Sequence, residues 1–387
     1  MKNISLLIIL ILTSIYYSSC VSYKAQYKED WQRHTVINDP YFSLYLIGDA
    51  GGTPMDSSTQ LFDHLKKELD AESANSGIVW LGDNIYPVAL APKSSVYYPL
   101  GKHRIMAQLR TMSDYKGYKF FVPGNHDWYT YGRIGLRRQE LLVDSVLLTA
   151  PNPNKQTNFF IPDKGCGDPQ IVDLTNDISL LLMDSHWFLN EKARSGDQEV
   201  CAVQTPEQYL NKLQSEILSN KDKSLIVASH HPPYTYSKHG GQFSFKDNVF
   251  PITQLVDWLY LPLPVSGIIF NNMRVRLSEQ DVYHPLYINY RSKMIEALEK
   301  KGSSIVASGH EHTLQLIENQ NQYFVVSGSG SKKSEVGMGR GSEFAIGQKG
   351  YVKVLFINPK KALLQFIVPG YFNANENIAF EKMIELD

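Results

Sequence analysis

The sequence has little cysteine and almost no net charge. Only three of its 387 residues are cysteine, and 38 basic side chains stand against 39 acidic ones, a formal net charge of -1. This balance argues against a protein that binds nucleic acid by bulk electrostatics. The chain also has no internal repeat and no low-complexity tract. With 43% hydrophobic residues, we expect one large domain, with or without an inserted piece.

The apolar run at the N-terminus is too short to cross a membrane comfortably. It extends from Ile4 to Ile15 and follows Lys2, whereas a transmembrane helix needs roughly 20 apolar residues. A charged start followed by a short apolar segment is typical of a secretory signal. We therefore predict a signal peptide over residues 1–19.

The end of this run resembles the processing site of bacterial lipoproteins. Ser18 and Ser19 directly precede Cys20, although Tyr17 stands where that pattern usually has leucine. We expect a lipid on Cys20 and a polar tether over residues 20–40, with an ordinary cleaved signal as the alternative. The protein would then be anchored to a membrane of the bacterial cell envelope, facing the periplasm or the exterior.

Lipidation would leave two cysteines, Cys166 and Cys201. In an oxidising exported compartment, two remaining cysteines can form a disulfide. Two separate free thiols are the alternative, and the sequence does not fix the distance between them.

Short apolar runs alternate with polar loops and helical patterns along the rest of the chain. Helices are expected at residues 59–72 and from Pro206 onward. Strands are expected at residues 42–47, 78–81, 119–122, 178–183, 224–228, 303–307, 323–326, 351–356 and 362–367. The pattern predicts an α/β domain over residues 41–387, with ligands collected at the C-terminal ends of strands.

The stretch from about residue 242 to 290 breaks this pattern. It contains apolar segments that proline interrupts, such as Trp258-Leu-Tyr-Leu-Pro-Leu-Pro264. We interpret it as an inserted cap or wall beside the site. A patch that contacts a membrane is the alternative interpretation.

Polar residues gather in five loops, four of which directly follow an apolar β run. These are Gly48-Asp49-Ala-Gly51, Gly82-Asp83-Asn-Ile-Tyr86, Gly124-Asn125-His126-Asp127, Ser229-His230-His231-Pro232 and Gly309-His310-Glu-His312. Any one of them could be an ordinary turn or helix cap. Together they offer carboxylates and imidazoles, which suit Zn, Fe or Mn better than Ca. So many donors favour a two-metal site, which can clamp a phosphate group.

The ordered set resembles the calcineurin-like metallophosphoesterases and, within them, the purple acid phosphatases. The superfamily carries Asp-x-His in its first loop, and here Gly51 replaces that histidine. Tyr86 matches the tyrosinate that binds a ferric ion in the purple acid subgroup. The motifs span roughly Leu44 to Gln315. The resemblance implies an αββα sandwich, in which helices flank two packed β-sheets.

The same resemblance implies which residues hold two metal ions. The first ion, Fe(III), would be held by Asp49, Asp83, Tyr86 and His312. The second, Fe(II), Zn or Mn, would be held by Asp83, Asn125, His230 and His310, with Asp83 bridging. The alignment through Val227-Ala-Ser-His230 and Pro232 favours His230 over the adjacent His231.

Two further histidines match the family's substrate-side residues. His126 follows Asn125, and His239 lies nine residues after His230. The resemblance implies that both hydrogen-bond the phosphate group and that one can protonate the leaving oxygen.

The implied function is the hydrolysis of phosphomonoesters by a metal-bound hydroxide. Hydrolysis of phosphodiesters, in cyclic nucleotides or lipid headgroups, is the first alternative. A non-catalytic surface lipoprotein is the second, although no predicted ligand is missing. The sequence departs from the small animal-type enzymes at Ala50, where they carry tryptophan, and across the insertion, which leaves substrate preference open. The expected partners are a phosphoester substrate and a membrane, without nucleic acid.

Overall fold

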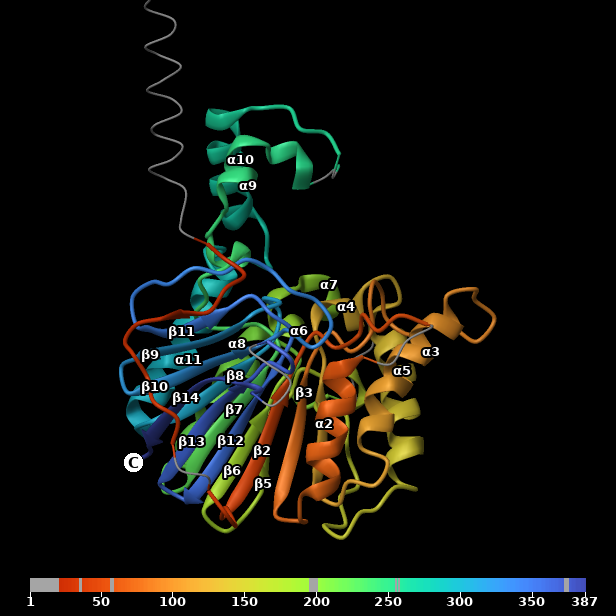
Figure 1. The fold of residues 1–387 in the computed structure, drawn as a ribbon. Helices are drawn as coiled ribbons and strands as arrows, with labels where there is room; N and C mark the ends of the chain where they lie inside the picture. Colours follow the sequence, from red (N-terminus) through yellow and green to blue (C-terminus); the bar gives the residue numbers. More distant parts are fainter. Residues whose placement is uncertain are drawn as a thin grey trace, which may run out of the picture.

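A computed structural model describes residues 21–34, 37–55, 59–194, 201–254, 256, 258–371 and 376–387. The predicted signal peptide and Cys20 lie outside these residues. Two β-sheets pack face to face, and helices cover their outer sides (Figure 1). The predicted sandwich is therefore confirmed.

The larger sheet has eight strands, of which β6, β7, β8 and β10 run parallel. In spatial order they are β1 (Gln26–Tyr27), β11 (Ser342–Ile346), β9 (Leu314–Asn319), β10 (Gln322–Ser327), β8 (Ser304–Ser308), β7 (Ser224–Ser229), β6 (Ile178–Leu182) and β5 (Gln170–Asp173). Parallel neighbours place their C-terminal ends at one edge of the sheet.

The second sheet has six strands, and β2, β3 and β4 are parallel. Its spatial order is β14 (Ile378–Glu385), β13 (Lys361–Ile367), β12 (Tyr351–Asn358), β2 (Phe42–Ile47), β3 (Ser76–Leu81) and β4 (Tyr118–Val122).

Residues of the central strands alternate between two cores. Leu44 and Leu46 of β2 lie in the core between the sheets, together with Ala228 and Ala307 from the opposite sheet. Tyr45 of β2 faces the other way, into the core under the helices. Because both faces are covered, these strands are apolar throughout, which is why their sequences read as continuous hydrophobic runs.

Five longer helices cover the sheets. They are α2 (Gln60–Ala71), α3 (Tyr98–Thr111), α5 (Gly132–Leu147), α8 (Pro206–Ser219) and α11 (Pro285–Lys301). The predicted helix starts are supported by capping, since the side chains of Thr59 and Thr205 accept backbone N–H groups of α2 and α8. Shorter elements are α4 (Asn125–Trp128), α6 (Ser185–Leu189), α7 (Glu191–Arg194), η1 (Asp163–Gly165) and η2 (Lys238–Gly240).

A lobe rises above the ends of the strands (Figure 1). It carries α9 (Phe245–Val249), η3 (Pro251–Gln254) and α10 (Pro264–Leu277). The predicted insertion reached about residue 290, but α11 begins at Pro285 and buries Tyr287 and Tyr290 in the main core. The projecting part, here called the cap lobe, is therefore residues 242–284.

Part of the predicted tether lies on the domain. Residues of β1 pair with β11, Ser22 exchanges backbone hydrogen bonds with Val336, and the ring of Trp31 packs 5.7 Å from that of Phe380. The segment thus covers the edge of the larger sheet, which protects β11 from pairing with other chains.

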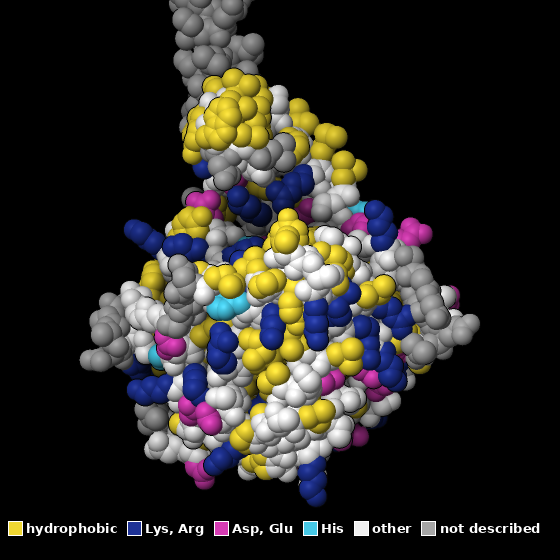
Figure 2. Space-filling view, turned by 90° about the vertical axis from the view of Figure 1, so that its right-hand side faces the viewer, with side chains coloured by type: hydrophobic (Ala, Val, Ile, Leu, Met, Phe, Trp, Pro, Cys, Tyr) yellow, Lys and Arg dark blue, Asp and Glu magenta, His cyan; other side chains and the backbone are white. Residues whose placement is uncertain are grey.

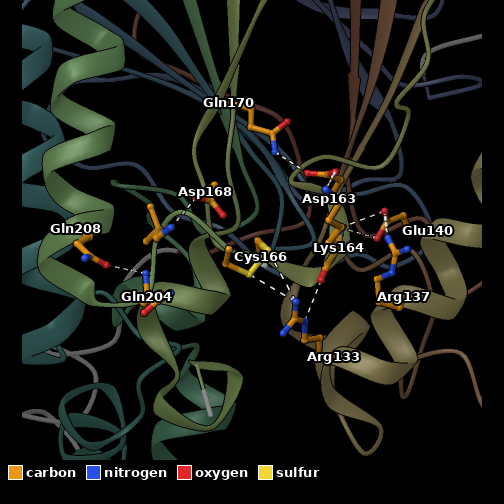
Figure 3. The surroundings of a disulfide bond; sticks show 12 residues. Arg133, Arg137, Glu140, Asp163, Lys164, Cys166, Asp168, Gln170, Gln204 and Gln208 are labelled. Atoms are coloured by element: carbon orange, nitrogen blue, oxygen red, sulfur yellow. Dashed lines mark hydrogen bonds and ion pairs between the residues drawn. A yellow bond between two sulfur atoms is a disulfide. The ribbon is translucent and has the colours of Figure 1, made fainter. Parts of the chain in front are cut away.

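Cys166 and Cys201 form a disulfide, with an S–S distance of 2.04 Å (Figure 3). It joins the loop after η1 to the segment before α8, and Arg133 lies beside the two sulfur atoms. Cys166, Asp168 and Cys201 have the spacing of a metal site, but bonded sulfurs cannot supply thiolate ligands. Of the two possibilities left open by the sequence, the structure has the disulfide.

Candidate metal centre

All five polar loops follow strands with parallel neighbours and meet where the two sheets adjoin. They follow β2, β3 and β4 of the smaller sheet and β7 and β8 of the larger one. Within the sheets, the Asp49 N–H donates to the Gly82 carbonyl (2.9 Å) and the Gly309 N–H donates to the His230 carbonyl (3.0 Å). Between the sheets, His230 Nδ1 lies 2.8 Å from the Leu81 carbonyl oxygen.

Four of the predicted ligands have a left-handed backbone. The φ angles are 56° at Asp49, 54° at Asp83, 71° at His310 and 48° at His312. Aspartate and histidine enter this region more readily than most residues, but it still costs free energy relative to right-handed conformations. Such outliers gather at functional sites, where surrounding structure holds them in place.

Tyr86 lies at the centre of the first cluster. Its hydroxyl donates to Asp49 Oδ1 at 2.7 Å and lies 3.1 Å from His312 Nε2. Asp49 Oδ1 and His312 Nε2 are 3.3 Å apart. Three potential ligand atoms from three loops thus converge on one point, as a metal ion would require.

Gly51 has no space for a side chain. A Cβ atom at this position would lie 2.5 Å from backbone atoms of Asn84 and Ile85. The space that a side chain at Gly51 would need is therefore filled by the backbone of the loop that carries Tyr86. The Tyr86 phenol, rather than a side chain from position 51, reaches the cluster. This is a structural reason for the pairing of Gly51 with Tyr86.

A second cluster lies beside the first. His230 Nε2 is 3.0 Å from Asn125 Oδ1, 3.2 Å from His310 Nδ1 and 3.5 Å from Asp83 Oδ1. All four side chains are buried. Their donor set of one carboxylate, one amide oxygen and two imidazoles suits Zn, Fe or Mn.

Outer hydrogen bonds select the ring nitrogens that face this cluster. The Leu81 carbonyl next to His230 Nδ1 favours a proton there, which leaves Nε2 as an acceptor. In His310 the arrangement is reversed, because Nε2 lies 3.2 Å from the Gln280 carbonyl and Nδ1 faces inward. Burial lowers the pKa of His310 well below its usual value, as does the neighbouring His239. His310 is therefore neutral and able to donate a lone pair.

Asp83 connects the two clusters. It lies within hydrogen-bonding range of both His230 and the Tyr86 phenol, and its Oδ1 accepts the His126 N–H at 2.9 Å. Burial raises the pKa of Asp83, but His230 and His126 lower it more, to about 2. A carboxylate that stays ionised between two donor clusters fits the predicted bridging role.

The Tyr86 phenol is neutral in this environment. Burial raises its pKa well above 10, and the carboxylates of Asp49 and Asp83 raise it further. Only a strong local positive charge would reverse this effect, as a bound cation does for water and thiols.

His126 lies beside the first cluster and His239 lies beside the second. The ring of His126 stands 4.5 Å from that of Tyr86, and its Nδ1 contacts the Pro87 carbonyl at 2.6 Å. The ring of His239 stands 4.2 Å from that of His310. Both side chains are about one quarter exposed, so a substrate could reach them.

Asp281, which contacts His239, was not predicted from the sequence. Its Oδ1 lies 2.6 Å from His239 Nδ1, and the carboxylate is fully buried. Burial lowers the pKa of His239, but the bond to Asp281 and the negative charges of Glu311 and Asp281 together raise it above its usual value. Asp281 belongs to the cap lobe and does not follow a strand in the sequence, so it is not part of any of the five motifs.

Two other features were not predicted. Lys332 Nζ lies 3.2 Å from the centroid of the Tyr86 ring, in the loop that follows β10. The sequence Gly328-Ser-Gly-Ser-Lys after an apolar strand could have indicated this loop as a sixth contributor. Asp127 accepts backbone N–H groups from Gly124 and Asn84, so it fixes the loops rather than facing the clusters.

His231 has other partners. Its Nδ1 lies 2.8 Å from Ser185 Oγ, and its Nε2 lies 2.7 Å from Gln280 Oε1. Both ring nitrogens of His231 thus contact groups other than Asp49 and Asp83.

Comparisons with known proteins identify the family of the chain and structures of similar fold. A family model for calcineurin-like phosphoesterases matches residues 35–314. No curated protein matches the sequence. Among solved structures, GAP50, the anchor in the inner membrane complex of Plasmodium, aligns with a TM-score of 0.54 and 14% identity, over 90% of each chain. The purple acid phosphatase PPD1 of yellow lupin (Lupinus luteus) aligns with a TM-score of 0.47 and 13% identity. That alignment covers 89% of this chain and 53% of the lupin chain.

Proposed function

The chain belongs to the calcineurin-like phosphoesterase family, and we propose that it is a purple acid phosphatase-like enzyme that hydrolyses phosphomonoesters. The observation that carries the proposal is the position of Tyr86. Its hydroxyl lies 2.7 Å from Asp49 and 3.1 Å from His312, while backbone fills the place beside Gly51. This arrangement provides a phenol where other members of the superfamily have an imidazole.

Two metal ions fit the donors that are present. Asp49, Asp83, Tyr86 and His312 would hold Fe(III), and Asp83, Asn125, His230 and His310 would hold Fe(II), Zn or Mn. When bound, such a pair acts as a Lewis acid on the phosphate oxygens and makes water nucleophilic near neutral pH.

The surrounding residues would then bind the substrate and transfer a proton. His126 lies beside Tyr86 and His239 lies beside His310, where both can hydrogen-bond a phosphate group. The carboxylate of Asp281 accepts from His239 Nδ1, so Nε2 remains available to the substrate. When His239 is protonated, its Nε2–H could donate a proton to the leaving oxygen, which makes the alcohol a better leaving group.

The first alternative is a phosphodiesterase, which would use the same residues with different pocket walls. The second is a non-catalytic protein, and the likeness to GAP50, an anchor in Plasmodium, is the observation that favours it. The complete donor set and both histidines favour catalysis instead.

We also propose that the protein is anchored by a lipid on Cys20, at a membrane of the bacterial envelope. This proposal is supported by the apolar segment near the N-terminus, which is followed by Ser18, Ser19 and Cys20. The anchored protein would face the periplasm or the exterior.

A substrate panel tests the proposed activity. Purified protein loaded with iron and zinc should cleave p-nitrophenyl phosphate with a kcat/KM at least about tenfold above that for bis-p-nitrophenyl phosphate, a difference of ~1.4 kcal/mol. Faster cleavage of the diester would support the phosphodiesterase alternative. Cleavage of neither substrate at full metal content would support a binding protein.

The visible spectrum tests the tyrosine site. Tyrosinate bound to Fe(III) absorbs visible light by charge transfer, so oxidised, iron-loaded protein should be coloured. Tyr86→Phe removes the oxygen and keeps the ring, so the band should disappear while the fold persists. Iron content is measured for both proteins. A colourless wild type that contains iron, or a phenylalanine variant that keeps the band, would contradict the purple acid assignment and leave the wider family intact.

A further inference from the structure

The cap lobe exposes an unusual amount of apolar surface. The exposed fraction is 78% for Trp258, 54% for Ile269, 54% for Met273 and 71% for Leu277. Figure 2 shows hydrophobic side chains gathered at the tip of the lobe, whereas charged side chains are scattered over the body below. Contiguous apolar patches of this kind mark sites of interaction with proteins or membranes.

Helix α10 exposes a row of these residues. Val265, Ile269, Met273 and Leu277 recur every four positions, so they lie along one side of the helix. All four are exposed. A helix normally packs such a row against its own domain, but here the row faces away from it.

Helix α10 is long enough to lie on the surface of a bilayer but too short to cross it. Helix α10 has 14 residues, fewer than the roughly 20 needed to cross a membrane. No helix in the described part of the chain is both long and apolar enough to cross one. Exposed Lys246, which stacks on Tyr260, and exposed Arg276 add positive charge. Among the described acidic residues of the lobe, Asp247 and Asp281 are buried and Glu279 is half-buried. Apolar and aromatic residues with basic neighbours are typical of interfacial segments.

The described chain begins at the base of this lobe. Val21 is the first described residue, and Gln242 is the first residue of the lobe. Both lie beside Gly337, because a Cβ atom built on Gly337 would be 3.5 Å from a side-chain atom of each. The charges of Lys246 and Asp247 in α9 act on Tyr23. Because neighbouring Cα atoms are only about 3.8 Å apart, a lipid on Cys20 would attach beside the lobe.

We propose that the cap lobe is a membrane-binding surface, with Trp258 and the exposed row of α10 inserted among phospholipids. The inference builds on the proposed lipid anchor, which would bring a bilayer to this side of the molecule. The anchor and the lobe would then make two separate contacts with one membrane. Since Gln280 and Asp281 belong to the lobe and touch His310 and His239, the binding surface would also fix the orientation of the catalytic centre.

Fluorescence quenching by lipid tests this directly. Full-length, exported protein is mixed with vesicles of anionic and zwitterionic phospholipids, with or without bromine on the acyl chains. Bromine quenches tryptophan only within the lipid layer. The emission assigned to Trp258, the difference between wild type and Trp258→Phe, should fall by about twofold or more with brominated vesicles, because interfacial segments reach the acyl boundary.

Two matched triple variants distinguish membrane binding by the lobe from non-specific binding by exposed apolar residues elsewhere. Ile269→Ser/Met273→Ser/Leu277→Ser should lose most of the quenching of Trp258. Ile134→Ser/Leu141→Ser/Leu148→Ser changes residues with exposed fractions of 70%, 57% and 57% at or next to helix α5, and should keep it. Circular dichroism and cleavage of a soluble phosphoester check the folding of both.

The outcomes also separate the lobe from the anchor. Incorporation of labelled fatty acid reports on Cys20 alone. Labelled protein that floats with vesicles but shows no quenching would overturn the inference and leave the anchor intact, whereas quenching of unlabelled protein would support the lobe without it. Burial of Trp258 in the absence of vesicles, with a doubled molecular mass, would assign the surface to a second copy of the chain and overturn the proposal.

Discussion

Replacement of Asp83 by asparagine is expected to lower kcat/KM for phosphoester hydrolysis by about a thousandfold or more, because metal ions contribute several kcal/mol of charge stabilisation to such reactions. Asp83 is 2% exposed and lies between the two donor clusters, beside His230 and Tyr86. Asparagine keeps its size and can still accept the His126 N–H. It carries no negative charge, so neither cluster should retain its ion at full occupancy.

Metal content, measured beside the kinetics, distinguishes this loss from misfolding. Asp83→Asn should fold normally and contain fewer metal ions per chain than wild type. Asp168→Asn is a matched control, because Asp168 is also a buried carboxylate and accepts one backbone N–H, from Val203 at 2.7 Å, but lies beside the disulfide. An Asp83→Asn protein with two ions and normal turnover would show that the bridge has been assigned to the wrong residue.

Loss of the disulfide should have the largest effect on stability. Cys166 and Cys201 are 35 positions apart, and closing a loop of this length restricts the unfolded chain. In the chain-entropy model the bond stabilises the folded protein by roughly 3–4 kcal/mol. Both cysteines are buried and neither belongs to the donor clusters. Cys166→Ser/Cys201→Ser should therefore unfold at lower urea concentration, with turnover of the folded protein unchanged.

Urea unfolding of metal-free protein, with and without a reducing agent, measures this effect. Reduction should shift the wild-type midpoint to that of the double variant and should not move the variant itself. Thiol titration of denatured, unreduced protein should find neither cysteine free. Equal midpoints for wild type and variant under oxidising conditions would mean that the bond contributes nothing to stability.

The central strands and their loops could be predicted because local signals marked them. Strands β2, β3, β4 and β7 are almost entirely buried and mostly apolar, and each is followed by a loop that contains Gly, Asp, Asn or His. Peripheral strands carry weaker signals. Strand β14 mixes Glu381, Lys382 and Glu385 with apolar residues, and its place depends on pairing with β13 rather than on its own composition.

Contacts made by the cap lobe could not be predicted in the same way. Asp281 reaches His239 only because the chain folds back over the strand ends after α10. Lys332 reaches Tyr86 only because the loop after β10 crosses to the other sheet. Both contacts depend on the packing of segments far apart in sequence, which hydrophobic periodicity does not report. The ligands could be grouped from the sequence because the resemblance to a family implied which of them share a metal ion.

The left-handed backbone at Asp49, Asp83, His310 and His312 has a consequence for protein engineering. Glycine adopts this conformation without steric cost, whereas other residues lose roughly 1 kcal/mol or more. A library selected for thermal stability alone would therefore be drawn toward glycine at four positions where the proposed catalyst needs its ligands. Stabilisation by design would have to exclude these loops, because heat tolerance gained there would remove the proposed metal ligands.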